Sequence, residues 1–184
     1  GGQPGGVQIS MLDIVAGLKA RGVDMPVLVR FADILASRVR KINESFAKAM
    51  SDIGYTGTYR GVFPIKVNQQ QQVVEDIAAA GRPYHFGLEA GSKPELIAAL
   101  AYVQDPESLI ICNGYKDEEF IDLALYACKM GRQTVLVVEM PSEVDLILSR
   151  SRALGIKARI GVRAKLAAKG GGHWNESGGD RSQF

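Results

Sequence analysis

Short apolar runs alternate with amphipathic segments through most of this chain, and this alternation limits its fold more than any other feature. We predict strands near residues 59–67, 84–90, 108–113, 133–139 and 158–164. The segments between them carry apolar residues at three- and four-residue steps, which predicts helices at 69–80, 93–103, 118–130 and 142–154. The strand at 133–139 is apolar on both faces, as a parallel strand covered by helices must be. Such a chain folds into either a doubly wound sheet or a (β/α)8 barrel.

The region before this alternation is different. We predict a short amphipathic helix over residues 9–22, a strand over 26–31 and a long helix over 32–53. We therefore expect an N-terminal segment with its strand in residues 1–31. Residues 32–184 are expected to form the first part of a barrel.

Helix boundaries are predicted from capping residues. Asn68, Ser92 and Asp117 each precede a predicted helix, where a side-chain oxygen can accept a backbone N–H. Ser92 and Glu95 have the spacing of a capping box, which makes a cap a better explanation for Ser92 than a catalytic hydroxyl. Ser142 and Asp145 show the same spacing and predict a cap at the last helix.

Polar residues that follow the predicted strands help to choose between the two folds. They are Lys66 and Asn68, Glu89, Asn113 and Lys116, Glu139, and Arg163. Polar groups from several strands that meet at the carboxyl ends are typical of a barrel. A Rossmann fold would instead place G-x-G-x-x-G after its first strand, and neither that motif nor a P-loop occurs. We therefore predict an α/β fold of the (β/α)8 TIM-barrel type, incomplete because only about five barrel strands are found.

Lys66 is a lone cation at the end of the otherwise apolar run 61–67. If this strand is buried, desolvation lowers the pKa of the amine and makes it a nucleophile able to form an imine with an aldehyde. Side chains alternate along a strand, so Lys66 is expected to face the inside of the barrel with Pro64, while Val67 faces the helices. The ordinary alternative is a solvated surface lysine.

Composition excludes several classes of protein. The 184 residues carry a formal net charge of +2, which indicates no particular attraction to nucleic acid or to a membrane surface. No apolar stretch approaches the roughly 20 residues that a membrane-spanning helix needs. Cys112 and Cys128 are predicted to be buried free thiols in apolar segments, and neither their spacing nor the histidines suggest a metal site.

Four sequence blocks carry a specific resemblance. They are residues 61–70 (GVFPIKVNQQ), 87–96 (GLEAGSKPEL), 111–117 (ICNGYKD) and 161–166 (GVRAKL), the last followed by a glycine-rich segment to Phe184 that contains Trp174. In this order and spacing they resemble the biosynthetic arginine decarboxylases. The resemblance covers about residue 26 to the last residue.

The resemblance implies a pyridoxal 5′-phosphate enzyme with an alanine-racemase-like barrel that converts L-arginine to agmatine and CO2. It implies that Lys66 holds the cofactor covalently, that Glu89 lies beside this lysine, and that Arg163 lies near the cofactor ring. It further implies polyamine (putrescine and spermidine) biosynthesis in the cytoplasm, a homo-oligomer built on dimers, and a magnesium requirement. The remaining cofactor-binding groups and a β-domain are expected beyond Phe184, so the 184 residues alone are expected to be inactive.

Other interpretations stay open at this point. Glu89 can be a carboxylate at the rim of the barrel paired with Lys66 or Lys116, and Arg163 can form an ion pair with Glu139. His85 is expected to be a packed or surface histidine. The glycine-rich segment 169–181 either covers the substrate or forms a surface loop. The substrate can also be ornithine, lysine or diaminopimelate, and the chain can belong to a non-catalytic single-barrel pyridoxal-phosphate carrier.

Overall fold

The computed structural model describes residues 8–164, and the chain divides into two units, residues 1–31 and 32–184. The first unit contains helix α1 (Met11–Ala20), whose N-cap Ser10 accepts a hydrogen bond from the backbone N–H of Asp13. The predicted strand at 26–31 is wrong, because no strand forms there. Its apolar residues favour an extended backbone, but a strand also needs a neighbouring strand to pair with, and none is paired with it.

The second unit begins with a long helix, α2 (Ala32–Asp52), close to its predicted bounds. Strands and helices then alternate as predicted. The strands are β1 (Val62–Pro64), β2 (Gly87–Ala90), β3 (Leu109–Cys112), β4 (Gln133–Val138) and β5 (Ile160–Val162). The helices are α3 (Gln71–Gly81), α4 (Lys93–Tyr102), α5 (Glu118–Lys129) and α6 (Pro141–Leu154), with 3₁₀ turns η1 (Ile65–Val67) and η2 (Arg82–Tyr84).

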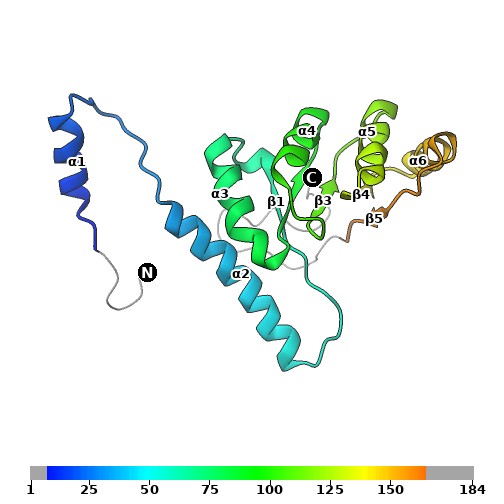
Figure 1. Ribbon diagram of the computed structural model, residues 1–184, viewed down its shortest axis with the longest axis horizontal. Helices are drawn as coiled ribbons and strands as arrows, with labels where there is room; N and C mark the ends of the chain where they lie inside the picture. Colours follow the sequence, from blue (N-terminus) through cyan, green and yellow to red (C-terminus); the bar gives the residue numbers. More distant parts are fainter. Residues whose placement is uncertain (1–7, 165–184) are drawn as a thin grey trace. The chain divides into compact units, whose positions relative to one another are not determined.

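The order of the strands decides between the two folds that the sequence left open. All neighbouring strands pair in parallel, and their order in the sheet is β1-β2-β3-β4-β5, the same as along the chain. In a doubly wound sheet the order of the strands would reverse at a switch point, and helices would cover both faces. Here α4, α5 and α6 lie side by side on one side of the sheet (Figure 1). The described sheet is therefore a five-stranded part of a TIM-type barrel, as predicted.

The core lies between the sheet and these helices. Leu88, Ile110 and Leu136 project from three neighbouring strands and are almost fully buried. They pack with Leu96, Ile121, Leu125 and Ile147 of the helices. Burying one such side chain contributes about 1.5–3 kcal/mol, so this layer is the main source of stability in the unit. A smaller cluster of Val39, Val73 and Ile77 joins α2 to α3.

The opposite face of the sheet is the one that a closed barrel would enclose. Directly paired residues of parallel strands lie on the same face, and Pro64 pairs with Glu89, which pairs with Ile111. Ile111 in turn pairs with Val135. This face is therefore mostly apolar. Glu89 lies on it, near the carboxyl end of β2.

The predicted caps have mixed outcomes. Ser92 and Asp117 cap α4 and α5 as predicted, accepting from the backbone N–H groups of Glu95 and Phe120. Asn68 is not the cap of α3, because its Oδ1 accepts from Gln70 N, and Gln70 is the N-cap residue.

The cap predicted at Ser142 is wrong. Helix α6 begins one residue earlier, at Pro141, with Met140 as its N-cap residue. Proline has no N–H to lose at the first helical position, which explains the earlier start.

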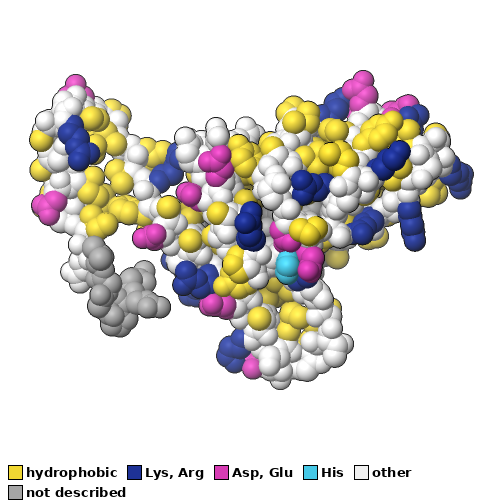
Figure 2. Space-filling model, in the orientation of Figure 1, with side chains coloured by type: hydrophobic (Ala, Val, Ile, Leu, Met, Phe, Trp, Pro, Cys, Tyr) yellow, Lys and Arg dark blue, Asp and Glu magenta, His cyan; other side chains and the backbone are white. Residues whose placement is uncertain are grey.

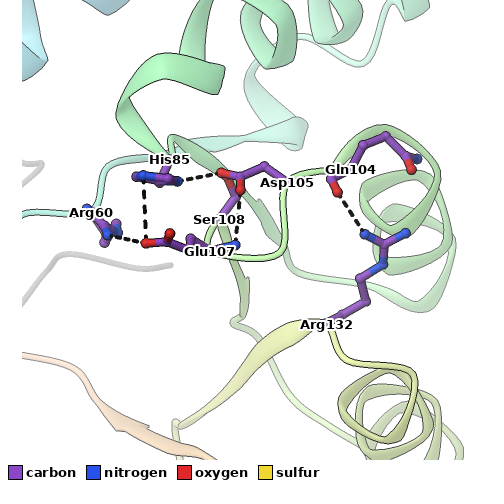
Figure 3. Close-up of polar contacts among 7 residues, drawn as sticks. All are labelled: Arg60, His85, Gln104, Asp105, Glu107, Ser108 and Arg132. Carbon is purple, nitrogen blue, oxygen red and sulfur yellow. Dashed lines mark hydrogen bonds and ion pairs between the residues drawn. The ribbon is translucent and has the colours of Figure 1, made fainter.

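A polar cluster lies at the amino ends of the first three strands (Figure 3). It consists of Arg60 before β1, His85 before β2, and Asp105, Glu107 and Ser108 before β3. His85 Nδ1 lies 2.8 Å from Asp105 Oδ2, which also accepts from Ser108 Oγ at 2.7 Å. Arg60 Nη2 lies 3.1 Å from Glu107 Oε2. Figure 2 shows a histidine side chain at the surface with acidic side chains directly beside it. His85 was expected to be a packed or surface histidine, and it is half-buried and paired with Asp105.

In the part of the chain that the structure describes, no helix has both the length and the apolar character that a membrane span requires.

Candidate functional site

Lys66 lies just beyond β1, in the 3₁₀ turn Ile65–Val67, and not on the strand as predicted. Pro64 has no N–H for a further ladder bond, and its pair with Glu89 is the last between β1 and β2. The predicted alternation therefore ends before Lys66. Ile65 is buried in the core, while Val67, predicted to face the helices, is 68% exposed. Lys66 is itself exposed, so the predicted burial on a strand is not observed.

Glu89 is the buried carboxylate of the site. It lies on β2 and is only 4% exposed. Its Oε1 accepts a hydrogen bond from Asn113 Nδ2 at 3.2 Å, whereas the buried Oε2 has no hydrogen-bond partner among the described residues. A buried acceptor without a partner costs about 1–3 kcal/mol, which makes Oε2 an unusual feature.

Burial raises the pKa of the Glu89 carboxyl above its ordinary value. The hydrogen bond from Asn113 opposes this rise, and so do the positive charges of Lys66 and Arg163. Both cations therefore act on one carboxylate although they come from opposite ends of the described sheet. Lys66 and Arg163 thus lie near enough to Glu89 for their charges to act on it. The roles predicted for these three residues stay predictions.

Arg163 follows β5 and has two electrostatic partners. Its Nη1 lies 3.8 Å from Glu139 Oε2, so the ion pair considered from the sequence does form. Its charge also lowers the pKa of Glu89. The ion pair with Glu139 therefore forms, while the predicted position of Arg163 near a cofactor ring stays a prediction.

Lys116 is not a partner of Glu89, contrary to one of the alternatives. Its side chain is fully buried, and its Nζ lies 3.5 Å from Glu143 Oε2. Glu143 is a residue that the sequence reasoning missed. Pro141 signals the first position of α6 and places Glu143 at the third, where a glutamate reaches back to a preceding backbone N–H. Glu143 does so with Glu139 N at 2.8 Å, and Glu95 does the same with Gly91 N at 2.6 Å.

Both cysteines are free thiols. Cys112 is buried as predicted, and desolvation raises the pKa of its thiol to about 12. Such a thiol stays protonated and acts as a core side chain. Cys128 is half-buried and hydrogen-bonds to Thr134.

A cavity of about 580 Å³ lies at the other end of the strands, between Lys129, Arg132, Lys157 and Arg159. It is distinct from the group around Glu89. Within residues 8–164 there is no set of three histidine, cysteine or acidic side chains arranged to hold a metal ion. The predicted roles of residues 165–184, including the glycine-rich segment 169–181, lie outside the described residues.

Comparisons with known proteins agree on one family. Residues 36–184 match the family model described as "Pyridoxal-dependent decarboxylase, pyridoxal binding domain". A biosynthetic arginine decarboxylase of Prochlorococcus marinus (strain MIT 9303) is 50% identical over 185 residues, covering 99% of this chain and 28% of the relative. One of Deinococcus radiodurans is 49% identical over 179 residues, covering 97% of this chain and 27% of the relative.

A solved structure gives the same result. The crystal structure of the biosynthetic arginine decarboxylase of Campylobacter jejuni superposes with a TM-score of 0.75 at 34% identity. The match covers 83% of this chain and 25% of that one. The chain thus spans little more than a quarter of the length of the curated relatives quoted above.

Proposed function

Because the chain belongs to the pyridoxal-dependent decarboxylases, in the part that forms their pyridoxal-binding domain, we propose that it is the first part of the barrel of a longer arginine decarboxylase. The complete enzyme converts L-arginine to agmatine and CO2. The relatives at about 50% identity, all named biosynthetic arginine decarboxylases, support this substrate over ornithine, lysine or diaminopimelate. The proposed division is an N-terminal segment to residue 31, followed by the barrel.

One observation carries the proposal: Glu89 is buried on β2 with its Oε2 unpartnered among the described residues, and Lys66 and Arg163, which follow the first and fifth strands, both act on it electrostatically. The arrangement fits a pyridoxal phosphate cofactor. A lysine amine is the group that attaches its aldehyde, and the buried Glu89 Oε2 has a free acceptor position among the described residues. When bound, the cofactor supplies an electron sink for the pair of electrons left as CO2 departs.

The residues of this chain have separate roles in the proposal. Lys66 holds the cofactor covalently through Nζ, and later returns a proton to the product carbon from the same atom. Glu89 stabilises the charged amine of Lys66. Because burial raises its pKa, it also holds a proton at a higher pH than an exposed glutamate does. Arg163, held by Glu139, provides a fixed positive charge at the same end of the sheet.

The proposal extends to the biological setting. We place the enzyme in polyamine biosynthesis in the cytoplasm, as a homo-oligomer built on dimers, with a magnesium requirement. What supports these points is the family resemblance.

The experiment is CO2 release from arginine, ornithine, lysine and diaminopimelate by the complete protein with added pyridoxal phosphate. Lys66→Ala is the test variant. Lys129→Ala, at the far end of the strands, is its control. We expect release from arginine alone, abolished by Lys66→Ala and retained by Lys129→Ala.

Borohydride reduction followed by peptide mass mapping gives a readout that does not depend on turnover. It should fix the cofactor to the peptide that contains Lys66. Cofactor fixed at Lys66 without CO2 release from any of the four amino acids would favour the non-catalytic carrier. The isolated 184-residue chain is expected to release no CO2.

A further inference from the structure

Lys116 and Glu143 form a buried ion pair that does not include Lys66, Glu89 or Arg163. Lys116 is in the loop Asn113–Asp117 between β3 and α5, and Glu143 is in the first turn of α6. Their side chains are 0% and 3% exposed, and Nζ lies 3.5 Å from Oε2. Removing two charges from water is costly, so a buried pair of this kind is weak evidence for stability alone.

The hydrogen bonds of this pair go to backbone groups of two loops. Glu143 Oε1 accepts from Lys116 N at 3.0 Å, and Oε2 accepts from Glu139 N at 2.8 Å. Lys116 Nζ donates to Gly114 O at 2.5 Å. The pair therefore joins the loop Asn113–Asp117 to the connection between β4 and α6.

Both loops carry groups of the proposed site. Asn113 donates to Glu89, and Gly114 N donates to Glu139 Oε1 at 3.3 Å. Glu139 in turn holds Arg163 through its other oxygen. A chain of contacts thus runs from Glu143 to Arg163 through Glu139, and from Lys116 to Glu89 through the loop.

We propose that Glu143, with Lys116, is a positioning residue of the decarboxylase, which fixes Glu139 and Asn113 and thereby orients Arg163 and Glu89 around Lys66. This inference rests on the proposed function for what the site binds. Glu143 itself touches neither Lys66 nor Glu89 in any recorded contact, and it acts through the two loops. Without its carboxylate, the buried Lys116 ammonium has no counter-charge, and the N–H groups of Lys116 and Glu139 lose their acceptor.

The test uses the complete protein with pyridoxal phosphate. E143Q keeps the shape of the side chain but has a single acceptor oxygen and no charge. A double variant, Lys116→Met with Glu143→Leu, replaces the pair by apolar side chains and avoids a lone buried charge. Lys93→Met is the matched control, because Lys93 forms an ion pair with Asp117 at 2.7 Å at the end of the same loop but is 40% exposed.

Three readouts are combined: the fraction of Lys66 trapped with cofactor by borohydride, hydrogen exchange of the backbone amides, and the separate values of kcat and KM. We expect E143Q to lower kcat about 10- to 100-fold with a smaller change in KM, the range for residues that support a site without contacting the substrate. The trapped fraction should fall at a fixed cofactor concentration. Exchange should accelerate in peptides containing residues 114–116 and 139–143, and not in those from α4. Lys93→Met should resemble the wild type in all three.

The outcomes separate this inference from the proposed function. If the wild type traps no cofactor at Lys66, the proposed function fails, and the inference with it. If the wild type is active and E143Q matches Lys93→Met in kcat and trapping, the inference alone is wrong, even if exchange is faster. If E143Q unfolds, the double variant decides: a folded double variant with lowered kcat supports positioning. If the double variant has the wild-type kcat, or if it also unfolds, the Lys116–Glu143 pair has a purely structural role.

Discussion

Asn113 Nδ2 donates to one carboxylate oxygen of Glu89 at 3.2 Å, and the other oxygen, which is buried, has no hydrogen-bond partner among the described residues. The charges of Lys66 and Arg163, which follow the first and fifth strands, both act on this carboxylate. Its environment is unfavourable for the fold and useful for a site that has to bind a polar ligand. Stability and function therefore make opposite demands on Glu89.

Glu89→Gln is expected to stabilise the cofactor-free protein near neutral pH. Burial raises the pKa of Glu89 in the folded state above the ordinary 4.5, so the folded protein holds this proton more tightly than the unfolded one. The wild type therefore loses stability as the pH rises above 4.5 and through the folded pKa, and the variant does not. Urea unfolding should show a gain of about 1 kcal/mol at pH 8 and little at pH 4.

The control for this change is Glu44→Gln, on the exposed side of α2, which should show no such pH-dependent gain. The complete enzyme should at the same time lose most of its activity with Glu89→Gln. A variant less stable than the wild type at both pH values would contradict the assignment of Glu89 as a strained buried carboxylate.

Gly114→Ala should be more harmful than Gly131→Ala, although both glycines have a positive φ (+77° and +84°). Both substitutions incur the cost of about 1–2 kcal/mol for a left-handed conformation. A Cβ at Gly114 would also lie 2.7 Å from the carbonyl oxygen of Gly91, whereas one at Gly131 would meet open space. We expect an additional loss of at least about 1 kcal/mol at Gly114 from this overpacking.

Thermal unfolding of the two variants measures this difference directly. Gly114→Ala should also lower kcat/KM, because the loop that carries Asn113 has to move, while Gly131→Ala should leave kcat/KM near the wild-type value. Equal effects of the two variants on stability would show that the contact with Gly91 is easily relieved.

Ser92→Ala tests whether this hydroxyl caps a helix or takes part in catalysis. Ser92 Oγ accepts from Glu95 N at 3.4 Å, a long bond at the start of α4. Losing such a cap should cost about 0.5–1 kcal/mol, at the lower end of the range for cap substitutions, with kcat unchanged. Ser92→Asn, which can still cap the helix, should restore stability. A tenfold fall in kcat with both variants would instead assign the hydroxyl to the site.

Asp105→Asn should weaken the polar cluster at the amino ends of the strands in a pH-dependent way. Burial alone would raise the pKa of Asp105, but hydrogen bonds from Ser108, the Glu107 N–H and His85 outweigh it and hold the pKa below the ordinary 3.8. The folded state thus favours the carboxylate, and its stabilisation is present above pH 3.8 and lost as the pH falls through the folded pKa.

We expect a loss of about 1–2 kcal/mol at pH 7 that disappears in strong acid, measured by urea unfolding across this pH range. Asp76→Asn, at an exposed position on α3, is the control and should change little. A loss of the same size at all pH values would mean that the shape of the side chain matters and its charge does not.

The sequence by itself determined the alternation of strands and helices, because it depends on local periodicity and on caps such as Ser92 and Asp117. It also placed Lys66, Glu89 and Arg163 at one end of the strands, since parallel strands bring their carboxyl ends together. The end of β1 at Pro64, with Lys66 on a turn, depended on where the ladder with β2 stops. The predicted strand at 26–31 was wrong for a related reason, because pairing requires a neighbour that local sequence does not reveal.

Only the tertiary structure determined which charged side chains contact one another. Periodicity placed Lys116 near Glu89, but side-chain packing buried it against Glu143, 27 residues away along the chain. Packing also left Glu89 Oε2 without a hydrogen-bond partner among the described residues. It placed the charges of Lys66 and Arg163 near enough to act on the Glu89 carboxylate. Burial and Coulomb interactions depend on distances in space, and residues on different strands acquire these distances only when the sheet forms.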